Sequence, residues 1–86
     1  MSTLYLVLAM RQPDFSDAVI QPHRDFLARL REQGQLQLTG GFSDGSGGAY
    51  VLCNVPSLAE AQAIVARDPL VLQGTSLLTV HEWNAH

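Results

Sequence analysis

The spacing of apolar residues predicts four strands and two main helices. Runs rich in β-forming residues predict strands at 3–9, 35–41, 49–55 and 75–83. Apolar residues three and four positions apart predict one helix over 22–33 and a second that starts after Ser57 and ends before Asp68. A turn of helix near 16–20 and a short turn within 70–74 complete the chain. The predicted order is therefore β-α-β-β-α-β.

Capping residues mark the ends of both helices, and this signal is independent of the periodicity. Gly34 is suited to end the first helix in the left-handed conformation. Ser57 and Glu60 form a capping box at the start of the second helix, which should end ahead of Pro69 because the residue before proline avoids the helical region. The composition of 42–48, FSDGSGG, predicts a loop between the two middle strands.

This order defines the α+β class with a ferredoxin-like fold, in which two helices cover one face of an antiparallel four-stranded sheet. The first strand is apolar on both faces: Leu4, Leu6 and Leu8 alternate with Tyr5, Val7 and Ala9. A sheet with one wet face alternates apolar and polar residues instead. We therefore expect the open face to pack on a second copy of the chain, as a homodimer, and a charge at Val7 to disrupt that dimer if Val7 lies on the open face.

Composition narrows the class further. The 86 residues suit one small domain, and 47% hydrophobic with 15% charged residues indicate a globular chain. The formal net charge is −3, and the five cations are all arginine, without aromatic clustering, so no nucleic-acid partner is expected. Three of them, Arg24, Arg29 and Arg31, are expected to form a solvated face of the first helix. With no signal-peptide pattern and no stretch long enough to span a membrane, we expect a cytoplasmic protein with no membrane association.

Three segments and a final strand ending in Trp83 resemble the YCII-related (YciI-like) family. The segments are HRDFLARLREQGQL, GGFSDGSGGAYVL and VPSLAEAQAIVARDP. The resemblance extends from Tyr5 to about Trp83 and implies a single YCII-related domain over 1–86 that dimerises as an α+β barrel. It also implies an active site built on a His–Asp pair, which corresponds here to His23 and Asp68. Some relatives are enzymes of aromatic degradation, including a dehydrochlorinase.

The chain departs from the family pattern at two positions. Gly40–Gly41 stand where the family often has Gly-Pro, and Leu70 stands where an aromatic residue often follows Asp-Pro. Both positions line the presumed pocket, so the resemblance does not carry a substrate over to this chain.

His23 falls on the apolar stripe of the first helix, three and four residues before Phe26 and Leu27. The positive end of the helix dipole disfavours an imidazolium there, and a neutral ring is the form that a general base needs. A pocket between this helix and the sheet would explain the position, with Asp68 orienting the ring. Two structural alternatives remain open: a core histidine with one satisfied hydrogen bond, and an Asp68 that only ends the second helix.

Five further residues are predicted to contact a small-molecule ligand: Gly41, Ser43, Asp44, Ser46 and His81. The first four come from the glycine-rich segment, which lacks a phosphate-binding pattern and suits a pocket rim, although Asp44 also suits a plain turn. His81 alternates with Thr79 and Trp83 along the last strand, and this stripe is expected to face the interior of the barrel and to supply pocket wall. No pair of residues has metal-ligand spacing, so neither a metal nor another cofactor is expected.

The function predicted from these residues is that of a small cofactor-independent enzyme. It would carry out acid–base chemistry, an isomerisation or an elimination, on a small, cyclic or aromatic molecule through His23 and Asp68. The alternative is a non-catalytic module of the same fold that binds a small ligand or serves as an accessory subunit. An enzyme requires one pocket that contains both side chains, with a ring nitrogen within about 3.2 Å of the carboxylate.

Overall fold

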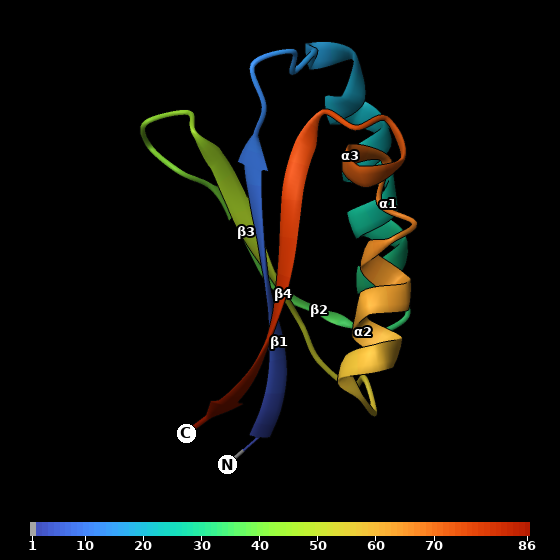
Figure 1. The fold of residues 1–86 in the computed structure, drawn as a ribbon. Helices are drawn as coiled ribbons and strands as arrows, with labels where there is room; N and C mark the ends of the chain where they lie inside the picture. The colour runs from blue at the N-terminus through green and yellow to red at the C-terminus, as the bar shows by residue number, and fades with distance from the viewer. Residues whose placement is uncertain (1) are drawn as a thin grey trace.

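The computed structural model describes residues 2–86, and it confirms the predicted α+β, ferredoxin-like fold. The elements are β1 (Ser2–Arg11), the 3-10 helix η1 (Asp17–Val19), α1 (Ile20–Glu32), β2 (Leu36–Gly41), β3 (Gly47–Leu52), α2 (Leu58–Val65), α3 (Pro69–Leu72) and β4 (Ser76–Ala85). The strands form one sheet in the order β2-β3-β1-β4, and every neighbouring pair is antiparallel. The helices all lie over one face of this sheet (Figure 1).

The helix ends follow the capping signals. The Ser57 hydroxyl accepts a hydrogen bond from the backbone N–H of Glu60 at 3.1 Å, and α2 starts at the next residue after Ser57. Gly34 has a φ of 73°, the left-handed conformation predicted for it. The first helix differs at its other end, because it starts at Ile20 and continues directly from η1. The turn of helix predicted near 16–20 is therefore joined to α1.

The strand β3 (Gly47–Leu52) is shifted toward the N-terminus relative to the predicted 49–55: it begins two residues earlier and ends three residues earlier. Gly47 and Gly48 pair with β1 although their composition predicts a loop. A side chain at Gly47 would collide with the backbone oxygen of Ala9, so this close pairing requires glycine. At the other end Asn54 has a φ of 55°, which is incompatible with a continuing strand.

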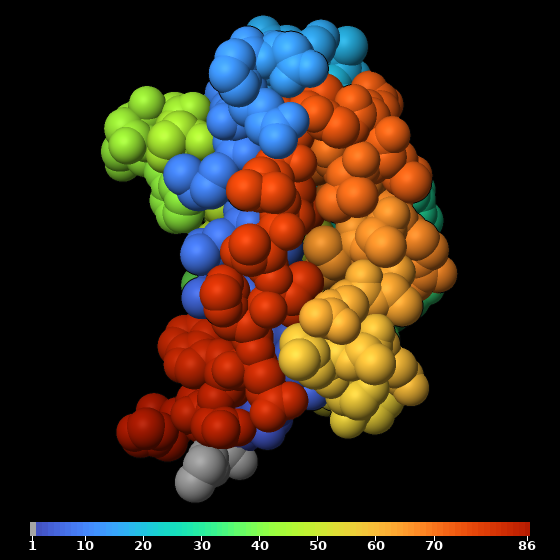
Figure 2. Space-filling view, in the orientation of Figure 1, coloured from blue at the N-terminus to red at the C-terminus, as the bar shows by residue number. Residues whose placement is uncertain are grey.

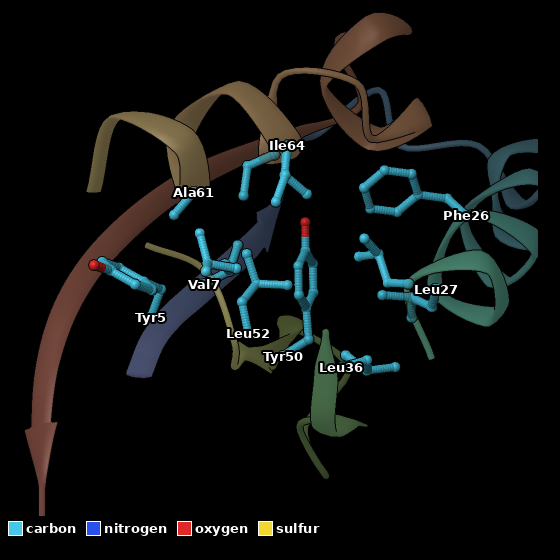
Figure 3. Close-up of a cluster of buried hydrophobic side chains, with 12 residues drawn as sticks. Tyr5, Val7, Phe26, Leu27, Leu36, Tyr50, Leu52, Ala61 and Ile64 are labelled. Atoms are coloured by element: carbon cyan, nitrogen blue, oxygen red, sulfur yellow. The ribbon is translucent and has the colours of Figure 1, made fainter. Parts of the chain in front are cut away.

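The core lies between the sheet and the helices. Val7 is fully buried there (0% exposed), beside Tyr50 and Leu52 of β3. In Figure 3 the Tyr50 ring stands between Phe26 and Leu27 of α1 on one side and Leu52 on the other. Val7 therefore faces the helices, and the suggestion that it tests the open face is wrong. Both faces of the first strand are apolar, so the alternation of its residues does not indicate which face the helices cover.

The open face carries the other set of strand side chains. Leu6 pairs with Val51 and with His81, and directly paired residues of antiparallel strands point to the same face. Large apolar side chains on the strands of this face remain exposed: Leu38 by 66%, Leu77 by 59%, Trp83 by 46% and Met10 by 40%. Among residues 2–86, no helix is both long and apolar enough to cross a lipid bilayer.

Candidate functional site

A cavity of about 320 Å³ lies between the first half of α1 and the sheet. The helix contributes Ile20, His23, Arg24 and Leu27 to its wall. Opposite them lie residues of β1, β2 and β3, including the four glycines at 40, 41, 47 and 48. This is the location predicted for the pocket from the apolar stripe of the helix. Gly40, Gly41 and Leu70 line it, so both departures from the family pattern do fall on the cavity.

The structure brings His23 and Asp68 together across 45 residues of sequence. The Nδ1 atom of His23, in the first turn of α1, lies 2.9 Å from Oδ1 of Asp68. The Asp68 side chain is completely buried, whereas the His23 side chain retains 19% of its exposure and lines the cavity. The distance satisfies the criterion of about 3.2 Å set for an acid–base pair.

The Asp68 carboxylate receives two further hydrogen bonds. Its Oδ1 also accepts the backbone N–H of Leu70 at 2.9 Å, which caps the start of α3, and its Oδ2 accepts the Tyr50 hydroxyl at 2.8 Å. A buried carboxylate requires such donors because moving a charged group out of water costs free energy that hydrogen bonds must offset. Asp68 does not end α2, which stops at Val65; it starts the next short helix and fixes the position of the carboxylate.

Tyr50 is the site residue that the sequence analysis missed. Its ring is 2% exposed and packs edge-on against Phe26, with ring centres 6.5 Å apart, and tilted against His23 at 5.9 Å. Burial, and then the charge and hydrogen bond of Asp68, raise the pKa of Tyr50 far above its ordinary value. Tyr50 is therefore a permanent hydrogen-bond donor to Asp68 at neutral pH. The alternation of β3 places Tyr50 on the face of Leu52, but its hydroxyl partner lies 18 residues away.

These contacts define the tautomer of His23. A carboxylate oxygen only accepts hydrogen bonds, so Nδ1 of His23 must carry the hydrogen that points to Asp68. The lone pair of the neutral ring is then on Nε2, the nitrogen that is free to act on a ligand. The arrangement of carboxylate, imidazole and cavity is one that can accept and return a proton.

The tip of the β2–β3 hairpin does not reach this cavity. Gly41 lines the cavity, but Ser43, Asp44 and Ser46 are absent from its wall. Figure 2 shows the hairpin tip projecting beyond the body of the molecule. Asp44 accepts the backbone N–H of Ser46 at 2.9 Å, and hydrogen bonding from the side chain and then the backbone of Ser46 lowers the pKa of the Asp44 carboxyl. The side chain of Asp44 thus makes the turn contact considered as its alternative role.

Two other residues complete the comparison with the predicted site. His81 lies on the open face of the sheet, which would face the interior of a dimeric barrel, and away from this cavity, and its Nε2 is 3.1 Å from the Thr79 hydroxyl. Its contact with a ligand stays a prediction. Arg24 is exposed, as expected for a solvated face, and it also lines the cavity beside His23. Within residues 2–86, no three His, Cys, Asp or Glu side chains converge as metal ligands.

The fold and the contact of His23 with Asp68 define a small ferredoxin-like protein with a hydrogen-bonded His–Asp pair at a cavity. The YCII-related domain matches residues 3–84, and the chain belongs to this family. It is similar to the uncharacterized protein YjpA of Bacillus subtilis, with 46% identity over 79 residues that cover 92% of each chain.

Two solved structures share the fold at lower identity. One is the 5-chloro-2-hydroxyhydroquinone dehydrochlorinase TftG from Burkholderia phenoliruptrix, in complex with 2,5-dihydroxybenzoquinone. It has a TM-score of 0.72 and 19% identity, and the match covers 96% of this chain and 95% of that one. The other is muconolactone isomerase, with a TM-score of 0.74, 18% identity, and coverage of 96% and 90%.

Proposed function

We propose that this protein is a small acid–base enzyme in which His23 moves a proton on a small organic molecule and Asp68 orients and stabilises the ring. The observation that carries the proposal is the 2.9 Å contact between Nδ1 of His23 and the fully buried Asp68, at the wall of a cavity. A histidine that served packing alone would not require a buried carboxylate behind it and a cavity in front of it.

The proposed reaction begins when the Nε2 lone pair of His23 takes a proton from the bound molecule. The ring becomes an imidazolium, and the Asp68 carboxylate stabilises that charge through Nδ1. In an isomerisation the proton returns to a different atom of the same molecule. In an elimination the electron pair of the broken C–H bond forms a double bond while a leaving group departs with its own bonding pair, and the imidazolium then releases its proton to the leaving group or to water. Tyr50 and the Leu70 amide hold Asp68 in place before the substrate arrives, so little reorganisation is needed.

The size of the cavity and the structural neighbours support a small, ring-sized substrate. A volume of about 320 Å³ lies at the lower end of the range for small-molecule sites. The names of the two solved neighbours describe a dehydrochlorination of a hydroxylated ring and an isomerisation of a lactone. A base that takes up and returns a proton is suited to reactions of both types.

We further propose that the open face of the sheet is covered by a second copy of the chain. The exposed Leu38, Leu77 and Trp83 lie on this face. An apolar patch of this extent indicates an interface. The homodimer is expected to bury a total of about 1,600 Å² or more.

The proposed chemistry can be tested by proton exchange at carbon in heavy water, followed by NMR, with muconolactone and 5-chloro-2-hydroxyhydroquinone as first compounds. His23→Gln should slow the exchange or turnover at least about 10²-fold, the lower end for general acid–base catalysis. Asp68→Asn should slow it less but in the same direction.

The matched control is His86→Gln, the same substitution at an exposed residue that lies outside the wall of this cavity, which should retain the wild-type rate. Turnover by His23→Gln at the wild-type rate would refute the acid–base role. A wild-type protein that binds these compounds without exchange or turnover, with affinity unchanged by His23→Gln, would instead favour the non-catalytic binding module.

A further inference from the structure

We propose that the cavity selects a small organic carboxylate, which Arg11 and Arg24 recognise at its mouth. This inference rests on the proposed function, since it names the substrate class of the same site. The cavity wall includes both arginines. It includes none of the eight Asp and Glu side chains of the chain, although the formal net charge is −3. Two arginines therefore line the cavity against one nearby carboxylate, that of Asp68, which lies behind His23 and Tyr50 and is not part of the wall. The mouth of the cavity is locally positive as a result.

Both arginines lack an ion-pair partner within residues 2–86, where the one contact between a basic and an acidic side chain is that of His23 with Asp68. Asp25, the residue after Arg24, accepts a hydrogen bond from the Gln21 side chain at 2.9 Å. The guanidinium N–H groups of Arg24 and Arg11 therefore remain available to an incoming anion. A guanidinium matches a carboxylate through two parallel hydrogen bonds, which gives geometric selectivity in addition to charge.

The Arg11 side chain is held at the cavity by an aromatic contact. Its guanidinium carbon lies 4.2 Å from the centre of the Phe15 ring, and Phe15 also lines the cavity. The stacked face of the guanidinium leaves its N–H edge free. Because the stacking already restricts the side chain, less conformational entropy is lost when Arg11 binds an anion.

Exposure sets the orientation of the bound molecule. Arg11 and Arg24 are exposed, whereas His23 is mostly buried beside them. A carboxylate bound by the arginines would lie at the mouth, and the remainder of the molecule would extend inward toward Nε2 of His23. The apolar side chains of Leu27 and Leu70 line the cavity and suit the hydrocarbon part of such a molecule.

The experiment compares two probes of the same shape, benzoate and benzamide, by calorimetric or NMR titration. The wild-type protein should bind benzoate more tightly than the neutral amide. Arg24→Gln and Arg11→Gln should each weaken benzoate binding about 3- to 10-fold and leave benzamide binding unchanged. The control is Arg31→Gln, which removes the same charge from α1 but does not line the cavity, and which should bind both probes like the wild type.

Several outcomes would overturn the inference. They are equal binding of benzoate and benzamide, no benzoate binding at millimolar concentration, or an equal loss of benzoate affinity in Arg31→Gln. Inorganic phosphate that displaces benzoate at lower concentration would assign the arginines to phosphate instead. His23→Gln separates the inference from the proposed function. If His23→Gln keeps both its preference for benzoate and the wild-type turnover, only the catalytic role of His23 is refuted. If His23→Gln loses turnover and the wild-type protein shows no preference for benzoate, only the carboxylate site is refuted.

Discussion

Replacing Tyr50 with phenylalanine removes one hydroxyl from the buried network at Asp68. The ring and its contacts with Phe26 remain, so the change isolates the 2.8 Å hydrogen bond to Oδ2. The bond joins a neutral donor to a charged acceptor that is completely buried, and bonds of this kind contribute about 1.5–3 kcal/mol. We expect Tyr50→Phe to lower the free energy of unfolding by about 2 kcal/mol at neutral pH.

The same hydroxyl should make stability depend on alkaline pH. The pKa of Tyr50 is raised in the folded protein above the ordinary value of 10.0. The stabilisation is therefore fully present below pH 10 and is lost as the pH rises from there toward the folded pKa, because only the unfolded chain ionises in that range. The wild-type advantage should shrink by about 1.4 kcal/mol for each pH unit above 10.

The measurement is urea unfolding of the wild type and Tyr50→Phe between pH 7 and about pH 11, a range that brackets the pKa of tyrosine in the unfolded chain. Tyr5→Phe is the matched control, because Tyr5 is also buried but makes no hydrogen bond to Asp68. The pKa of Tyr5 is raised by burial and then by Glu82, so its pH effect has the same sign and is expected to be smaller. A Tyr50→Phe cost no greater than that of Tyr5→Phe would refute the reasoning.

Four shorter predictions follow from the fold. Leu6→Glu places a charge on the open face and should give monomers or precipitate, whereas a wild-type protein that sediments as a monomer at micromolar concentration would contradict the dimer. Gly41→Val has room for its first carbon and should keep the melting temperature while abolishing benzoate binding; unchanged binding would remove Gly41 from the cavity wall. Ser57→Ala should cost about 1 kcal/mol in urea unfolding, and a neutral result would dismiss the cap. Gly47→Ala should unfold the protein or shift its melting temperature sharply downward, unlike Gly40→Ala, which has open space.

The sequence predicts the elements well where the signal is local. The Ser57 cap and the left-handed Gly34 depend on neighbouring residues, and both are confirmed. The bounds of β3 are wrong because they depend on a partner strand: pairing with β1 recruits Gly47, which local composition assigns to a loop. The same limit applies to Val7, since the choice of the covered face is made by the helices and not by the strand.

The candidate site depends on contacts between residues that are far apart in the sequence. The residues alone therefore did not decide between a catalytic and a structural role. Periodicity places His23 on the apolar stripe, but its contact with Asp68 spans 45 residues, and only the family resemblance paired them. Tyr50 offered no separate signal, because its alternation in β3 is that of an ordinary core residue. Arg24 is exposed, as predicted, but its place in the cavity wall could not be predicted because most of that wall is formed by segments from elsewhere in the chain.

The three bonds on Asp68 also bear on how the protein opens and closes. They join α1 through His23, β3 through Tyr50 and the start of α3 through the Leu70 amide. Breaking any one of them exposes a buried carboxylate, so these segments should open as one cooperative unit. In hydrogen exchange, the Leu70 amide should therefore exchange only through openings that also release His23. The pair of His23 and Asp68 would then have no locally unfolded state of its own, because the pair separates only when this part of the fold opens.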